Sequence, residues 1–200
     1  MIKIPPFQSQ AGQDAFVFEL LVHPRGDGAR TNGTFLDIGA NHPKEWSNTW
    51  ALEQIGWKGV LVEREPYAAG LLRNQRTSKV MQDDATLIDW SKLPEFFDYL
   101  SLDVDYISHK VLLDILVAGM KFALITLEHN EWNYPVKGSP RLAGRGLLQA
   151  HGYELICGNV RSNGQPFEDW WVDPKLVDLE VAHKFRCDGM EGLEIVNAFK

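Results

Sequence analysis

Acidic side chains follow two strand-like segments near the start of the sequence, where each could reach a ligand. Asp37 lies in residues 34–41, where an apolar run is followed by Gly39, which permits a sharp turn and lets a ligand approach the backbone. Glu63 ends a second apolar run. A carboxylate at such a strand end can accept hydrogen bonds from both hydroxyl groups of a ribose. The two acids therefore predict a nucleotide-type cofactor site, although a plain tight turn is the alternative for residues 34–41.

Two later strand-like segments also end in side chains that could take part in catalysis. Asp103 and Asp105 end one of them, and Glu128 and His129 follow the apolar run 122–127. Asp105, His109, Glu128 and His129 are candidates for a general base that removes a proton from an alcohol or phenol. His129 is favoured because the ordinary pKa of histidine lies near neutral pH, although a polar loop residue is its simpler interpretation. The same acids with His129 could instead hold a divalent cation, but we expect no metal site.

Length and composition indicate a globular protein with a single domain. A chain of 200 residues can bury one sizeable core, and 44% hydrophobic with 24% charged residues is an ordinary proportion. The formal net charge of −7 counts against binding of nucleic acid through the overall charge. The sequence has no apolar window as long as a membrane span and no signal-peptide core. We expect a cytoplasmic protein with one domain over residues 1–200, a loose lead-in at 1–8, and no nucleic-acid or membrane partner.

The two cysteines, Cys157 and Cys187, match neither a metal-binding spacing nor a disulfide framework. Two such residues in a chain of this length are typical of buried thiols. We therefore expect both to be reduced, in a reducing compartment.

The elements that position these side chains alternate between strand and helix patterns. Near-continuous apolar strands between helices are typical of a mostly parallel sheet covered on both faces, and a closing strand pair joined at 163–166 makes one edge antiparallel. The predicted fold class is therefore α/β and Rossmann-like. Periodicity and turn residues predict strands at 34–36, 59–63, 80–81, within 96–105, 122–127, 153–157 and 169–172, and helices at 15–22, 47–56, 66–74, 108–119, 140–150 and 176–181.

The order of these motifs resembles the Class I S-adenosylmethionine-dependent methyltransferases and, more narrowly, the FkbM-type family. The resemblance implies a seven-stranded sheet that binds S-adenosylmethionine and a transfer of its methyl group to an acceptor oxygen. It spans most of residues 9–177. The segments that carry it are Ser9–Asp14, Phe35–Asn41, Ser47–Thr49, Gly56–Glu63, Asp98–Asp105 and Gly152–Tyr153.

The resemblance also implies which residues bind the cofactor. Residues after the first strand would surround its methionine and ribose portions, and Glu63 would hold the ribose hydroxyls. Residues after the third strand would flank adenine, and Asp103 would lie under the sulfonium. The predicted cofactor residues are Asp37, Gly39, Asn41, Asn48, Glu63, Asp84, Ala85 and Asp103.

The acceptor side is less well defined by the sequence. Asp105 is followed by Tyr106 where the family commonly has glycine, and a bulky ring there would reshape or cover the acceptor pocket. Trp46 and Trp132 lie in predicted loops above the sheet, where flat apolar walls could bracket a sugar or an aromatic ring. The expected acceptor is a small hydroxylated molecule, of sugar or natural-product type.

Two other functions are consistent with parts of this pattern. A non-catalytic binding protein with a methyltransferase fold is one, and the Tyr106 departure favours it. A dehydrogenase that uses NAD is the other, because it also ends its second strand in an acid, but residues after Gly39 lack the glycine-rich fingerprint of that class.

Overall fold

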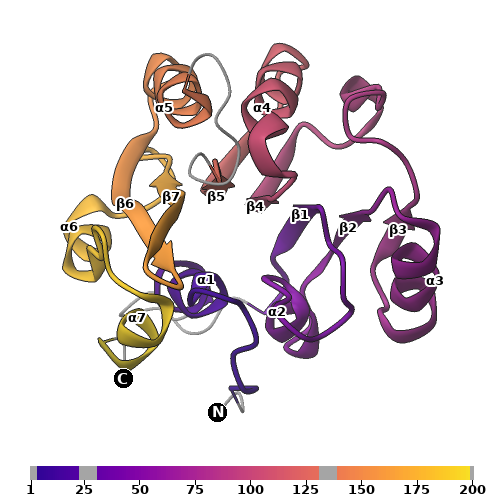
Figure 1. Ribbon diagram of the computed structural model, residues 1–200, viewed down its shortest axis with the longest axis horizontal. Helices are drawn as coiled ribbons and strands as arrows, with labels where there is room; N and C mark the ends of the chain where they lie inside the picture. The colour runs from indigo at the N-terminus through magenta and orange to yellow at the C-terminus, as the bar shows by residue number, and fades with distance from the viewer. Residues whose placement is uncertain (1–3, 23–30, 131–138, 199–200) are drawn as a thin grey trace.

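Over the described residues (4–22, 31–130 and 139–198), the computed structural model contains one sheet of seven strands with helices on both faces (Figure 1). The strands are β1 (Thr34–Ile38), β2 (Lys58–Val62), β3 (Lys79–Met81), β4 (Phe96–Leu102), β5 (Lys121–Glu128), β6 (Glu154–Ser162) and β7 (Gln165–Val172). The α-helices are α1 (Gln13–Val17), α2 (Trp50–Gln54), α3 (Pro66–Gln75), α4 (Ser108–Val117), α5 (Pro140–Ala150), α6 (Leu179–Ala182) and α7 (Gly192–Ala198). The shorter helices are the π-helix η1 (Phe18–Val22) and the 3-10 helices η2 (Trp90–Lys92), η3 (Asp105–Ile107) and η4 (His183–Phe185).

The strand order in the sheet is β3-β2-β1-β4-β5-β7-β6. β1 pairs in parallel with β2 and β4, whereas β7 lies antiparallel to both β5 and β6. The predicted Rossmann-like sheet, mostly parallel with an antiparallel edge, is therefore confirmed. The order reverses between β1 and β4, and in open α/β sheets such a reversal leaves a crevice beyond the carboxyl ends of the two strands.

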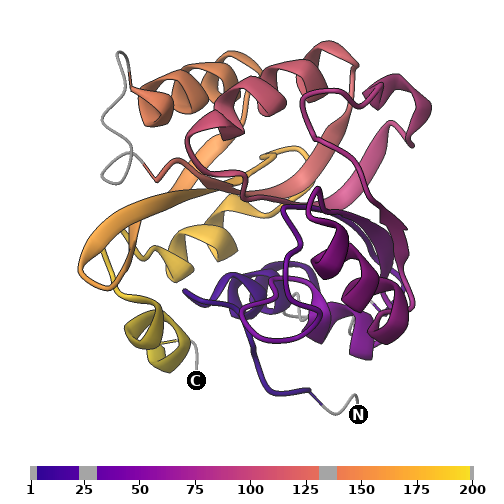
Figure 2. The ribbon, with the colours of Figure 1, turned by 45° about the vertical axis from the view of Figure 1, so that its right-hand side comes forward.

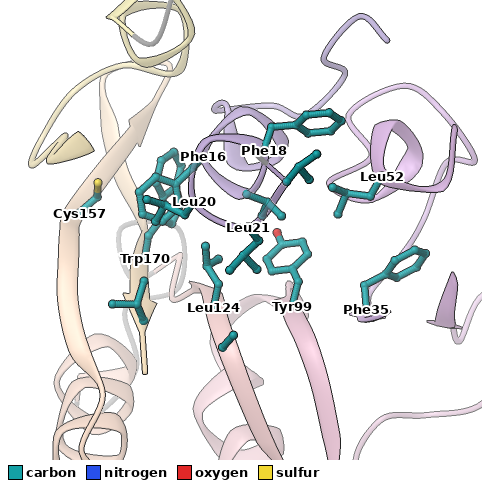
Figure 3. Packing of buried hydrophobic residues seen from close by; sticks show 14 of the residues in the cluster. Phe16, Phe18, Leu20, Leu21, Phe35, Leu52, Tyr99, Leu124, Cys157 and Trp170 are labelled. Atoms are coloured by element: carbon teal, nitrogen blue, oxygen red, sulfur yellow. The ribbon is translucent and has the colours of Figure 1, made fainter. Parts of the chain in front are cut away.

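The helices form two layers around the sheet. Helices α4 and α5 lie on one face, and α1, α2 and α3 lie on the other (Figure 2). Trp170 and Trp171 are adjacent in β7 and fully buried, yet they join different apolar clusters because side chains alternate along a strand. Figure 3 shows Trp170 against Phe16 of α1, with ring centroids 4.8 Å apart.

The helix expected at 47–56 and the last two strands differ in length from the observed elements. The helix is the shorter α2, which begins after Thr49, and the Ser47 hydroxyl accepts the N–H groups of Thr49 and Trp50 at 3.4 and 3.1 Å just ahead of it. The last two strands are longer than expected and meet at Asn163 and Gly164. These two residues have φ values of 52° and 77°, which is typical of a two-residue hairpin turn.

Cys157 of β6 and Cys187 form a disulfide, so the expectation of two free thiols is wrong. The partners are 30 residues apart, a spacing that marks no known framework in the sequence. The chain around Cys187 runs beside β6, where Gly189 donates its N–H to the carbonyl of Gly158 at 2.9 Å. The disulfide therefore fastens the C-terminal part of the described chain to the edge of the sheet.

The N-terminal segment is held by packing rather than by regular structure. Residues 4–8 lie in neither a helix nor a strand, but the ring of Phe7 packs edge-on against Phe18 with centroids 5.2 Å apart. The backbone N–H groups of Gln8 and Ser9 donate to the buried carboxylate of Asp14 at 2.6 and 3.2 Å. Of the helices in the described ranges, none has both the length and the apolar character needed to cross a bilayer.

Candidate functional site

A cavity of about 390 Å³ opens at the carboxyl ends of β1, β2 and β4, where the strand order reverses. Sites for small molecules typically measure roughly 300–1,000 Å³. All eight predicted cofactor residues line this cavity, and so does Asp105. Glu128 and His129 are not among the lining residues. The structure thus brings Asp37 and Glu63 to one crevice, and what they bind there stays a prediction.

Hydroxyl groups hold Asp37 at the end of β1. Its side chain is almost fully buried and accepts hydrogen bonds from the hydroxyls of Thr49, at 2.6 Å, and Ser101. Burial raises the pKa of Asp37, and the Thr49 hydrogen bond and the positive charge of Arg76 oppose that rise. The pKa of Asp37 is raised overall, and these two contacts limit the rise. A cationic group bound beside Asp37 would favour its charged form further.

The turn after β1 requires glycine for the predicted reason and for a second one. Gly39 has a φ of 86°, as a sharp turn needs, and it lines the cavity. A Cβ atom there would also lie 1.8 Å from the carbonyl oxygen of Asp103, so the missing side chain makes room for the backbone after β4. The ends of β1 and β4 are in direct contact as a result.

Glu63 is fixed by backbone donors on both carboxylate oxygens. Oε2 accepts the N–H of Asn41 at 2.9 Å, and Oε1 accepts the N–H of Glu65 at 2.7 Å. Asn41 adopts a left-handed backbone, with a φ of 47°, to make this contact. Each oxygen keeps a lone pair, so the carboxylate can still accept ribose hydroxyls.

Asn48 lines the cavity and, within the described part of the chain, has one side-chain oxygen without a partner. Its Nδ2 donates to the hydroxyl of Ser101 at 3.0 Å, but its Oδ1 is buried and has no hydrogen-bond partner among the described residues. An unsatisfied buried acceptor costs about 1–3 kcal/mol. A donor on a bound ligand is the expected partner.

Asp84 and Ala85 form the wall that follows β3. The carboxylate of Asp84 accepts the N–H and hydroxyl of Thr86 at 2.9 and 2.7 Å, and Arg64 lies 3.3 Å away. The hydrogen bonds from Thr86 lower the pKa of Asp84, so this group is anionic at neutral pH. A carboxylate here could accept a hydrogen bond from an amino group such as that of adenine.

Carboxyl groups crowd together behind the cavity, at the ends of β4, β5 and β7. Glu128 is hydrogen-bonded to Asp103, and it lies opposite Glu168 in the strand register. Burial and the charge of Asp103 raise the pKa of Glu128 to about 12, and burial raises the pKa of Glu168 to about 8. Glu128 is therefore neutral at pH 7 and donates its proton to Asp103.

The three predicted catalytic residues lie in different surroundings. Asp105 lines the cavity, has a left-handed backbone with a φ of 55°, and accepts a hydrogen bond from Asn130 at 3.0 Å. His129 is buried, with Nε2 4.0 Å from the carboxylate of Asp169. Glu128 carries a proton and cannot accept another on the same oxygen. This geometry favours Asp105 as the base, and the catalytic roles stay predictions.

The acceptor-side residues can be placed in part. Trp46 lines the cavity, with 73% of its surface exposed, whereas Trp132 lies outside the described residues. Tyr106 is 40% exposed and is not a lining residue, so its ring does not close the cavity. Within the part of the chain that the structure describes, no group of three or more His, Cys, Asp or Glu side chains is arranged to hold a metal ion.

Arg76, which no sequence pattern singles out, organises one wall of the cavity. Its guanidinium donates to Glu53 at 3.1 Å and to Thr49 at 3.1 Å, and Thr49 in turn binds Asp37. Its hydrogen-bond partners lie 23 to 33 residues away in the sequence, so no local pattern marks the position. An arginine just after a predicted helix gives no sign that it will be buried.

Solved structures with a similar fold include several methyltransferases. The O-methyltransferase from Bacillus cereus in complex with SAH superposes with a TM-score of 0.57 at 16% identity, covering 85% of this chain and 84% of that one. A chain of the fibrillarin/Nop5p complex has a TM-score of 0.55 at 12% identity, covering 82% and 79%. A TehB-like SAM-dependent methyltransferase from Corynebacterium glutamicum has a TM-score of 0.52 at 13% identity, covering 81% and 87%.

These identities are low, so the likeness shows that the chain has the Rossmann-like methyltransferase fold and shows nothing finer. No protein-family model matches the chain, and no curated protein matches it. The narrower resemblance to the FkbM-type family therefore stays a prediction.

Proposed function

We propose that this protein is an S-adenosylmethionine-dependent methyltransferase that binds its cofactor in the cavity between the ends of β1 and β4. One observation carries the proposal: Asp37, Glu63 and Asp84, which lie at or just beyond the carboxyl ends of three neighbouring strands, line the same cavity. Open α/β sheets bind their ligands at this kind of reversal in strand order. The similar solved structures support the choice of cofactor, because they include a SAM-dependent methyltransferase and an O-methyltransferase in complex with SAH.

The charge of the cavity also supports a cationic cofactor. S-adenosylmethionine carries positive charge on its sulfonium and on its amino group. Both charges are attracted by a carboxylate-rich wall, and loss of the methyl group removes the sulfonium charge, which favours release of the product. Arg64 is a lining cation, and the lining acids are Asp37, Glu45, Glu63, Asp83, Asp84, Asp103 and Asp105.

For the transferred methyl group we propose an oxygen on a small hydroxylated acceptor. Displacement at a sulfonium requires that donor and acceptor are held in line and that the acceptor loses its proton. Asp105, held by Asn130 at the cavity wall, is our candidate for the base, and His129 is the alternative. Trp46 offers a flat apolar surface to a sugar or an aromatic ring at the same cavity.

Three finer assignments have different support. Membership of the FkbM-type family rests on the sequence motifs alone. A non-catalytic role drew its support from Tyr106, whose ring does not line the cavity. A cytoplasmic location stays a prediction, and the Cys157–Cys187 disulfide counts against it because disulfides are rare in reducing compartments.

Calorimetry with S-adenosylhomocysteine tests the proposal. We expect the wild-type protein to bind it, and Asp37→Ala and Glu63→Ala each to lose at least about tenfold in affinity, because each removes a charge-assisted hydrogen bond. Glu95→Ala is the control, since Glu95 is exposed and does not line the cavity. Wild-type affinity in both cavity variants, or a thermal shift with NAD in place of S-adenosylhomocysteine, would contradict the assignment.

A further inference from the structure

Arg76, the residue after α3, carries a fully buried positive charge close to the cavity. Its side chain is 0% exposed, and that of Glu53, which it contacts at 3.1 Å, is 3% exposed. Burying a guanidinium is costly unless its charge is paired and its N–H groups all find acceptors. Such a group therefore has a strongly defined geometry.

The other donors of Arg76 reach the segment between β1 and α2, which forms one wall of the cavity. Nη1 donates to the Ser47 hydroxyl at 3.2 Å and to the Pro43 carbonyl at 3.3 Å, and Nη2 donates to the Thr49 hydroxyl at 3.1 Å. Ser47 lines the cavity, and Thr49 binds Asp37. One side chain thus holds three points of this wall.

Because a guanidinium only donates hydrogen bonds, it sets the direction in which its partner hydroxyls point. The Thr49 oxygen accepts from Arg76, so its single proton goes to Asp37, 2.6 Å away. The Ser47 oxygen accepts from Arg76 and from the N–H groups of Thr49 and Trp50. Since Ser47 lines the cavity, an acceptor on a bound ligand could take its proton.

The side-chain amide of Asn48, next to Ser47, is oriented by Ser101 of β4 and not by Arg76. Asn48 donates to Ser101, so the Ser101 proton goes to Asp37, and the buried Oδ1 of Asn48 is left without a partner among the described residues. Two residues with acceptor oxygens, Asp37 and Asn48, therefore lie on this wall beside Ser47, whose hydroxyl can donate. This arrangement complements the ammonium and the carboxylate of an amino acid.

We propose that Arg76 is a positioning residue for the amino-acid portion of S-adenosylmethionine. It acts by directing the Thr49 proton to Asp37 and the Ser47 proton into the cavity, so that the wall accepts the ligand's ammonium and donates to its carboxylate. Arg76 does not itself line the cavity and acts through these partners. The inference rests on the proposed function, because it takes S-adenosylmethionine as the ligand.

Two probes that differ in the amino-acid portion test this role by calorimetry. S-adenosylhomocysteine contains that portion, whereas 5′-methylthioadenosine keeps the adenosine and the sulfur but has neither ammonium nor carboxylate. In Arg76→Lys, which keeps the charge but loses the planar fork, we expect at least a tenfold loss of affinity for S-adenosylhomocysteine and less than a twofold change for 5′-methylthioadenosine. Arg73→Lys, at an exposed position of α3, is the matched control and should change neither affinity.

A second pair of variants keeps the test valid if Arg76→Lys folds poorly. Thr49→Val removes the hydroxyl at nearly constant shape and should reproduce the selective loss, whereas Thr49→Ser keeps the hydroxyl and should restore binding. An equal loss for both probes, or unchanged binding of S-adenosylhomocysteine in both Arg76→Lys and Thr49→Val, would overturn the positioning role. A wild-type protein that binds neither probe would instead contradict the proposed function.

Discussion

The two ends of the sheet accommodate buried carboxyl groups in different ways. At the β1–β3 end, the buried cation of Arg76 pairs with Glu53 and supports Asp37 through the hydroxyl of Thr49. At the β5–β7 end, Glu128 and Glu168 lie opposite each other in the strand register, and the charge of Glu168 adds to the rise in the pKa of Glu128. The first end places a cation and hydroxyl donors beside its acids. At the second end Arg145 pairs with Asp169 at 2.8 Å, whereas Glu128 and Glu168 lie beside other carboxyl groups and are balanced by protons.

The first end of the sheet is therefore suited to bind a charged ligand, whereas the second end is suited to lie in the core. Burial raises the pKa of Asp37, and the hydrogen bond from Thr49 and the charge of Arg76 limit that rise, which helps the ionised form that a cationic ligand needs. A protonated carboxyl such as Glu128 serves as a hydrogen-bond donor, and it keeps that role only while the pH stays below its pKa. Cofactor binding should therefore depend on the first end, and the pH dependence of stability should come from the second.

Breaking the ion pair at the first end should have the largest effect. Arg76→Met leaves the buried carboxylate of Glu53 without its cation, and we expect the free energy of unfolding to fall by about 3–5 kcal/mol. Urea denaturation at pH 7 measures this loss. The double variant Arg76→Met/Glu53→Gln should recover part of it, because no unpaired charge remains. A loss below about 1 kcal/mol in the single variant would show that the pair is not buried as described.

Removing the disulfide tests how strongly the second end depends on its covalent link. Closing a loop of 30 residues is worth roughly 3–4 kcal/mol, mainly through the entropy of the unfolded chain, so Cys157→Ala/Cys187→Ala should lower the free energy of unfolding by that amount. Denaturation of both proteins with and without a reductant measures the effect. The reductant should destabilise the wild-type protein alone. If the reductant leaves the free energy of unfolding of the wild-type protein unchanged, the two cysteines are free thiols, as the sequence predicted.

The proton held by Glu168 should make the second end sensitive to alkaline pH. Its pKa is about 8 in the folded protein against an ordinary value of 4.5, so the folded state binds the proton more tightly than the unfolded state. The resulting stability is complete below about pH 4.5 and is lost as the pH rises through 8. We expect wild type to lose on the order of 2–4 kcal/mol between pH 5 and pH 8.5, as measured by urea denaturation.

Glu168→Gln should remove the share of this pH dependence that Glu168 contributes, because its amide stays neutral and its oxygen can still accept the N–H of Trp170. The raised pKa of Glu128 should maintain the remainder. The exposed control Glu95→Gln should keep the wild-type dependence. An identical pH slope in Glu168→Gln and wild type would place the responsible group elsewhere.

The features that the sequence could predict are those encoded by neighbouring residues. Asp37 and Glu63 each follow a short apolar run with glycine nearby, and such runs end at the same edge of a parallel sheet, so their convergence on one crevice could be expected. The resemblance to a known family added Asp84 and Asn48, which also line the cavity. None of these inferences needed contacts between distant parts of the chain, apart from the parallel pairing itself.

The features that could not be predicted depend on distant contacts. Arg76 becomes a buried hub only because α3 returns it to the segment between β1 and α2, and Cys187 meets Cys157 only after the chain passes back along β6. Glu168 lies opposite Glu128 because of the antiparallel register of β5 and β7. The alternation of apolar and polar residues along a strand does not determine that register. In each case the sequence shows a common residue type, and the fold gives it an uncommon environment.

The smallest expected effect is at the edge of the cavity, where Trp46 has a left-handed backbone with a φ of 60°. This conformation costs a residue with a side chain roughly 1–2 kcal/mol, and a ring that is 73% exposed regains little by burial. Trp46→Gly should therefore unfold at a higher temperature than Trp46→Ala, by a difference equivalent to about 1 kcal/mol, because alanine keeps the strain. At the exposed Leu87, whose φ is not positive, the order of the glycine and alanine variants should reverse.

Strain of this kind persists where a residue serves a function, so the same pair of variants relates Trp46 to the first end of the sheet. If the indole packs against the acceptor, Trp46→Gly gains stability and loses acceptor affinity, whereas cofactor affinity, which depends on Asp37 and Arg76, stays at the wild-type value. Equal stability of the two Trp46 variants would show that the backbone at Trp46 is not strained and that Trp46 is an ordinary exposed residue. A loss of cofactor affinity in Trp46→Gly would show that this edge of the cavity belongs to the cofactor site. The whole segment between β1 and α2 would then contribute to cofactor binding at the first end of the sheet.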